Sequence, residues 1–140
     1  MRRSFDDLRI YPKAREVARA VFRLSQTFPK EEMYSLTDQF RRAAQSVGAQ
    51  IAEACRQRRY EKHFGSKLTD ADAEQIETQH WVGEALDCGY LNPAEVAQLN
   101  SGLEAVGRML NSMMEKSDAF CGLPDGVLRE DATDYFTDAD

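Results

Sequence analysis

Residues 92–114, NPAEVAQLNSGLEAVGRMLNSMM, predict a helix with one apolar side. Asn92 suits the cap position before a helix, Pro93 suits the first helical position, and Glu95 follows at the third. Beyond them the apolar side chains recur at alternating steps of three and four, the spacing of a helix face that packs against other helices. These side chains are Val96, Leu99, Leu103, Val106, Leu110 and Met113. The stretch therefore predicts one helix of a bundle.

Three further segments show helical periodicity, and none shows convincing strand alternation. They are residues 12–28, which end before Pro29, residues 35–57, and residues 60–87, which end before Gly89. Proline disfavours helix at the residue before it, and glycine suits the left-handed position that follows a helix. The joints are short, so neighbouring helices should be antiparallel. The sequence thus predicts an all-α, up-down-up-down four-helix bundle.

The charge of the chain is concentrated at its C-terminal end. The chain has 24 acidic residues and 18 Lys and Arg, a formal net charge of -6. Residues 117–140 hold seven of the acids and one arginine, which leaves 17 of each sign in residues 1–116. We therefore expect a neutral bundle in residues 1–116 and an acidic tail in residues 117–140. The apolar residues expected to dock the tail, for instance on a neighbouring subunit, are Leu123, Val127, Leu128, Tyr135 and Phe136.

Composition and cysteine usage indicate a soluble protein of the cytoplasm. Apolar residues make up 42% and charged residues 30%, which fits one globular domain. The opening MRRSFDDLRI has no apolar signal region, and no run of apolar residues is long enough for a membrane span. Cys55, Cys88 and Cys121 lie far apart without metal-binding spacing, so we expect reduced thiols, two of them buried.

The sequence offers little support for an enzyme. Four-helix bundles can hold two metal ions with two Glu-x-x-His pairs, and Glu77 and His80 form one such pair. The second is missing, because Tyr60 stands three residues before the other histidine, His63. There is also no glycine-rich phosphate loop, and a cysteine on an apolar helix face is more often inert packing than a nucleophile. We therefore expect no catalytic residue, no cofactor and no metal.

A cluster of arginines lies in residues 39–59, QFRRAAQSVGAQIAEACRQRR, which contain five arginines and one glutamate. Arginines neutralise phosphates and neighbouring aromatic rings can stack on bases, so the cluster is a candidate nucleic-acid site. The alternative is a solvated helix corner with partial salt bridges. The candidate contacts are Arg41, Arg42, Arg56, Arg58 and Arg59.

Small residues recur at every fourth position of the second predicted helix. They are Ala44, Gly48 and Ala52. Because they lack bulk, another helix backbone can come close to this edge. The edge is therefore a candidate for subunit contact.

The third predicted helix places polar side chains at or near core positions, namely Asp72, Gln75 and Gln79. Leaving such a group buried and unpaired would cost about 1–3 kcal/mol. Either the helix rotates so that Ala73 and Ile76 face inward, or the polar groups bond one another or a neighbouring subunit. The three polar residues are therefore also candidates for subunit contact.

Several motifs occur in the order found in one known family. They are FDDLRIYPKA at residues 5–14, FPKEEMYSLTDQFRRAAQSVGAQIAEA at residues 28–54, IETQ followed by CGYL, and MLNSMM at residues 109–114. With them, residues 5–116 resemble the four-helix-bundle proteins encoded in intervening sequences of bacterial 23S ribosomal RNA genes. That family also contains accessory proteins of diversity-generating retroelements. The resemblance implies a closed bundle and a homopentamer with its protomers in a ring.

Together these features predict a non-enzymatic scaffold or interaction protein that assembles into a ring. A closed ring needs a heterologous interface, in which two different patches meet. The alternative is a nucleic-acid-binding accessory protein, in which arginines of the second helix and of the joint after it align across subunits.

Overall fold

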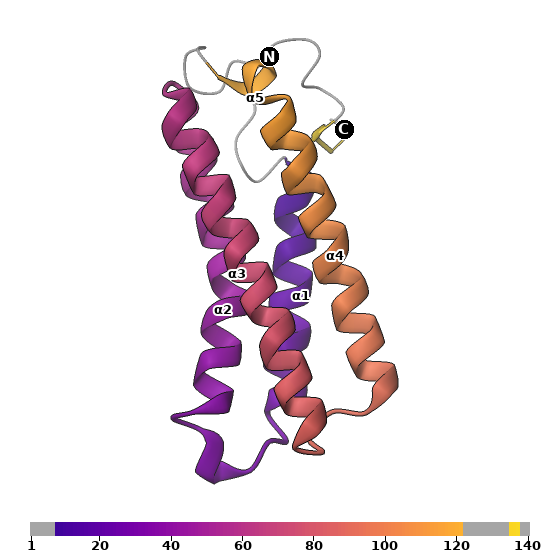
Figure 1. The fold of residues 1–140 in the computed structure, drawn as a ribbon. Coiled ribbons are helices and arrows are strands. Elements are labelled where there is room, and N and C mark those ends of the chain that lie inside the picture. The colour runs from indigo at the N-terminus through magenta and orange to yellow at the C-terminus, as the bar shows by residue number, and fades with distance from the viewer. Residues whose placement is uncertain (1–7, 122–134, 138–140) are drawn as a thin grey trace.

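A computed structural model describes residues 8–121 and 135–137, and four long helices lie side by side in it (Figure 1). The helices are α1 (Ile10–Ser25), the 3-10 turn η2 (Lys30–Glu32), α2 (Leu36–Arg56), α3 (Glu61–Asp87), α4 (Pro93–Glu115) and the short α5 (Ser117–Phe120). Within the described residues no β-strand forms, and Leu8 and Phe136 make one isolated antiparallel bridge. The predicted all-α four-helix fold is confirmed.

The four long helices form a square. The helix α1 packs on α2 and on α4, and α3 packs on the same two helices. The helices α1 and α3 are therefore diagonal to each other, and the α1/α2 side of the bundle lies opposite the α3/α4 side. This placement decides which surfaces a neighbouring molecule can meet.

Local signals set the start of α4 and the end of α3 as predicted, whereas α1 begins at Ile10 and ends at Ser25 instead of spanning the predicted residues 12–28. The backbone N–H of Glu95 donates to the Asn92 side chain over 2.8 Å, and the backbone N–H of Asn92 donates to the Glu95 carboxylate over 2.9 Å. This reciprocal pair satisfies two amides at the start of α4, with Pro93 as the first helical residue. At the end of α3, Gly89 has a φ of +77°, a conformation that residues with a Cβ rarely adopt.

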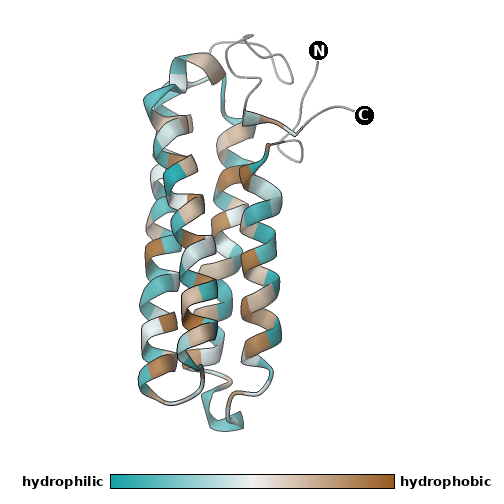
Figure 2. Cartoon of the chain, turned by 90° about the vertical axis from the view of Figure 1, so that its right-hand side faces the viewer, coloured by the Kyte–Doolittle hydropathy of each residue, from teal (hydrophilic) through white to brown (hydrophobic). Residues whose placement is uncertain are grey.

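The core consists of two clusters of buried apolar side chains. Apolar and polar residues alternate along each helix (Figure 2). The first cluster contains Phe64, Phe120 and Phe136. The second contains Phe28 and Phe40. None of the helices in the described part of the chain combines the length and the apolar character needed to cross a membrane.

The sequence left open whether the third helix rotates or whether its polar side chains bond one another or a neighbouring subunit. The structure distinguishes the rotated helix from the hydrogen-bonded one. The Gln79 amide donates to the Gln75 oxygen over 2.7 Å, and the Gln75 amide donates to the Asp72 carboxylate over 3.0 Å. Ala73 is exposed and Ile76 is 56% exposed, so the helix does not rotate to bury them. The polar groups bond one another, which removes the cost of burying Gln75 unpaired.

The C-terminal residues 135–137 lie against the start of α1. The backbone N–H of Arg9 donates to the Tyr135 carbonyl over 2.8 Å, and Arg9 Nε donates to the Phe136 carbonyl over 2.6 Å. The Tyr135 hydroxyl lies 2.6 Å from Ser112 Oγ, and Phe136 is buried in the first core cluster. Three residues of the tail also expected to dock lie outside the described residues: Leu123, Val127 and Leu128.

Candidate functional site

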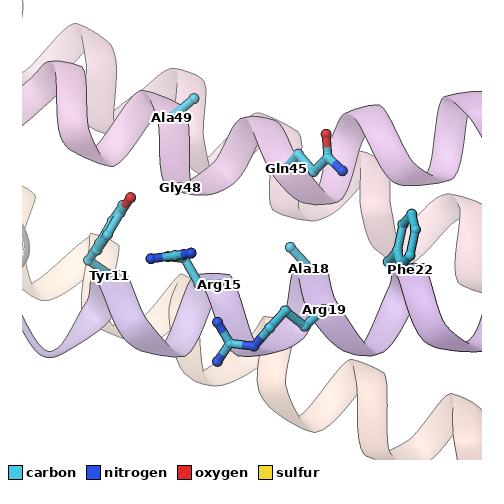
Figure 3. Close-up of a pocket in the computed structure, with 8 residues that line it drawn as sticks. All are labelled: Tyr11, Arg15, Ala18, Arg19, Phe22, Gln45, Gly48 and Ala49. Carbon is cyan, nitrogen blue, oxygen red and sulfur yellow. The ribbon is translucent and has the colours of Figure 1, made fainter.

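A groove of about 600 Å³ runs between α1 and α2 (Figure 3). Ala18, Gly48 and Ala49 are small and leave space between the two helices, whereas the rings of Tyr11 and Phe22 stand at its two ends. Phe22 is 46% exposed, although it is a large apolar side chain. The groove therefore presents apolar surface in a concave shape, which favours contact with an apolar side chain of a partner.

Arginines surround this apolar surface. Arg15 and Arg19 line the groove, and the Arg15 guanidinium lies 5.8 Å from the centre of the Tyr11 ring. The Arg41 guanidinium lies 4.5 Å from the centre of the Phe22 ring, and its Nε donates to Ser25 Oγ over 2.8 Å. Among the described residues that line the groove, none is acidic. The groove therefore favours a partner that combines an apolar side chain with negative charge.

The opposite side of the bundle has a second groove, of about 370 Å³, between α3 and α4. Ile76 lines it and is more than half exposed. The charged residues that line it are Asp72, Glu104 and Arg108. The three polar residues predicted for subunit contact, Asp72, Gln75 and Gln79, all line this groove.

The two diagonal helices carry opposite charge. In α1, four Lys and Arg stand against a single glutamate. Residues 68–87 of α3 contain six acids and neither Lys nor Arg. Burial raises the pKa of Glu74 in this helix, and the neighbouring carboxylates of Glu77 and Asp70 raise it further. The bundle is therefore polarised from α1 to α3, although residues 1–116 are neutral in sum.

The three small residues predicted to form one edge of α2 have different surroundings in the structure. Ala44 is buried in the second core cluster, and Ala52 is half-buried. Gly48 lines the α1/α2 groove, where a Cβ would lie 3.7 Å from the Tyr11 ring, an ordinary contact distance. Of the three small residues, Gly48 alone lines the α1/α2 groove, which lies on the side of the bundle opposite the groove of Asp72, Gln75 and Gln79, whereas Ala44 is enclosed in the core of its own chain.

Three of the five predicted nucleic-acid contacts are engaged within the chain. Arg41 binds Ser25, and Arg42 Nε lies 3.1 Å from the Asp38 carboxylate. Arg58 is 3% exposed and its Nε donates to the Cys55 carbonyl over 3.2 Å. The prediction for Arg58 is corrected, because the turn after α2 carries its side chain into the interior and away from any phosphate.

Arg56 and Arg59 do share a surface groove, of about 400 Å³. Tyr60 and His63 also line it, with their ring centres 5.6 Å apart, and Tyr60 is 59% exposed. The structure therefore brings together two of the predicted arginines with two rings on which a base could stack.

The residues on the α1 side of the first groove are not among the site residues predicted from the sequence. Arg15 and Arg19 are four positions apart, which places them on one helix face. Phe22 lies next to that face and outside the apolar stripe of the helix. A basic pair next to an aromatic residue outside the apolar stripe is the sequence signal that could have predicted a binding surface on this helix.

Within residues 8–121 and 135–137, no three His, Cys, Asp or Glu side chains gather as a metal site would require. As the sequence predicts, two of the three free thiols, Cys55 and Cys121, are buried, while Cys88 is exposed. Burial raises the pKa of Cys121 to about 11, the opposite of nucleophile activation.

In the native protein we expect iodoacetamide to alkylate Cys88 first at pH 8. Only the thiolate reacts, and burial disfavours the thiolate of Cys121. The stabilisation from keeping Cys121 protonated is complete below its usual pKa of 9.0 and is lost as the pH rises to about 11. Peptide mass spectrometry measures the labelling, with Cys88→Ser as the control. Equal labelling rates for Cys88 and Cys121 would contradict the prediction.

Comparison with known proteins supports the fold described above. Residues 6–112 match the family described as 23S rRNA-intervening sequence protein. No curated protein matches the chain. A solved structure from Bacteroides thetaiotaomicron, a protein of unknown function from the S23 ribosomal protein family, is similar with a TM-score of 0.69 and 24% sequence identity. The match covers 76% of this chain and 95% of that one, and at this identity it shows a shared fold.

Proposed function

The chain belongs to the 23S rRNA-intervening sequence protein family, and we propose that it is a non-enzymatic scaffold of the cytoplasm that assembles with copies of itself. Membership of the family supplies the fold, and the function has to be argued from the surface. The observation that carries the proposal is the polarity of the bundle, with its basic helix α1 diagonal to its acidic helix α3.

This polarity favours head-to-tail contact. Two copies that met through identical faces would oppose like charges, whereas contact between the α1 side of one and the α3 side of the next opposes unlike charges. Such a heterologous contact repeats from copy to copy, and it closes into a ring when the rotation between copies permits. A ring of five protomers is the assembly that the family resemblance implies.

Light scattering on the purified protein tests this proposal. We expect a mass of roughly five times the 15.9 kDa of one chain, at both low and moderate salt. A mass of one chain over the whole accessible concentration range would overturn the scaffold proposal.

A second candidate function is binding of nucleic acid at the groove that contains Arg56 and Arg59. The favouring observation is that both arginines share this groove with the exposed ring of Tyr60 and with His63. Guanidinium groups bind phosphates, and aromatic rings stack on bases without sequence preference. In a ring, the same corner from each copy would add to a larger positive potential.

The double variant Arg56→Glu/Arg59→Glu is expected to abolish nucleic-acid binding in this second candidate. The probe is a mixed pool of RNA and single-stranded DNA, and binding should weaken steeply with salt because phosphate contacts release counterions. The control Arg23→Glu reverses one charge on the exposed surface of α1, outside the groove, and should leave binding unchanged. If the assembled protein does not bind the RNA and single-stranded DNA even at low salt, this second candidate function is overturned and the scaffold proposal stands.

A further inference from the structure

We propose that the α1/α2 groove of one copy receives Ile76 from the α3 helix of the next copy. The inference rests on the proposed self-assembly and names the two surfaces that would meet. The receiving surface, here called the socket, is the groove lined by Tyr11, Arg15, Ala18, Arg19, Phe22, Gln45, Gly48 and Ala49. The inserted surface, here called the ridge, is the face of α3 that carries Asp72, Ile76 and Gln79 along one edge of the α3/α4 groove.

The shape of the socket suits an aliphatic side chain. Small residues from both helices leave it open, and the rings of Tyr11 and Phe22 close its two ends (Figure 3). Its volume of about 600 Å³ is ample for one branched aliphatic side chain. Filling the socket would cover Phe22, which is 46% exposed in the single chain.

The ridge has a matching apolar centre on an ordered helix face. Ile76 is 56% exposed, which leaves most of its apolar surface in contact with water. Asp72 precedes it by one helical turn, and hydrogen bonds through Gln75 link Asp72 to Gln79. These bonds hold the polar side chains beside Ile76 in place before any contact forms, which lowers the entropy lost on association.

The charges of the two surfaces are complementary. The socket carries Arg15 and Arg19, and none of its described lining residues is acidic. The ridge carries Asp72. The α3/α4 groove beside it is also lined by the acidic Glu104 and by one basic residue, Arg108. Glu74 and Glu77, within two residues of Ile76 on the same helix, add to the negative charge near it. A second copy of this chain therefore provides both the apolar knob and the negative charge that the socket favours.

Both surfaces are available at once, because they lie on opposite sides of the bundle. Each copy can receive one ridge and donate another, as every protomer of a ring must do. The two surfaces differ, so a change in one leaves the other intact. Two variants, each changed in one surface, can therefore be mixed. A protein that had lost its solubility or its fold would not give the result expected of that mixture.

The test uses two variants of the full chain, Ile76→Arg in the ridge and Ala18→Arg in the socket. Each is expected to reduce the mass in light scattering to that of a single chain, because Ile76→Arg would set a charge against the basic socket and Ala18→Arg would fill the space that receives Ile76. An equimolar mixture of the two is expected to form a dimer, since the intact ridge of one variant fits the intact socket of the other. Circular dichroism checks that both variants keep the helical fold.

The matched control is Met33→Arg, which introduces the same charge at a side chain 49% exposed and outside both grooves, and which should assemble normally. If the wild type assembles and Ile76→Arg assembles equally well, the ridge assignment is overturned and the scaffold proposal stands. Loss of assembly in both variants without a dimer on mixing also overturns the pairing. A wild type that remains a single chain overturns both proposals. This holds even if its socket is found to bind an acidic peptide, because the partner would then not be a second copy of the chain.

Discussion

Phe136→Ala is expected to lower the free energy of unfolding by about 3–5 kcal/mol, the usual cost of truncating a buried phenylalanine. The Phe136 side chain is 1% exposed, and its ring centre lies 6.5 Å from that of Phe120. Removing the ring leaves a cavity between the start of α1 and the end of α4, and the neighbouring rings can fill it in part only. The bridge between Leu8 and residue 136 would be weakened as well.

Urea denaturation followed by circular dichroism measures this loss. The control Tyr60→Ala removes a ring that is 59% exposed, and it should change the stability by less than about 0.5 kcal/mol. Equal stability of Phe136→Ala and the wild type would mean that residues 135–137 contribute nothing to the core. The expected loss would instead make this segment part of the folded unit, although it lies beyond residues 6–112, which match the family.

Phe40→Ala is expected to cost about 3–5 kcal/mol for the same physical reason, at the other end of the bundle. Phe40 is 0% exposed and belongs to the second core cluster. Its ring is stacked on that of Phe28, with the ring centres 6.1 Å apart. The alanine variant therefore loses both buried apolar surface and an aromatic pair.

The same denaturation experiment measures this second variant, with Tyr34→Ala as its control because Tyr34 is 92% exposed. A loss below about 1 kcal/mol would contradict the placement of Phe40 in the core. Because Phe40 and Phe136 belong to separate clusters, the double variant should show the sum of the two losses within about 0.5 kcal/mol. A larger deviation would show that the two clusters are coupled through the bundle.

Local signals in the sequence predicted the helices well. The cap formed by Asn92 and Glu95 and the left-handed Gly89 lie where the sequence predicts them. Such signals act within one or two turns of chain, and the apolar periodicity of each helix follows from its own geometry. The polar segment of α3 was harder, because periodicity could not distinguish a rotated helix from the observed bonds between Gln75 and its neighbours.

The sequence by itself determined the four helices, the start of α4 and the end of α3, because capping and periodicity are properties of neighbouring residues. The tertiary structure alone decided that Arg58 turns inward and that Arg15 and Arg19 stand over a groove. It also decided that the groove and Ile76 lie on opposite sides of the bundle. These outcomes depend on which helices become neighbours, which is settled by packing between residues far apart in the chain.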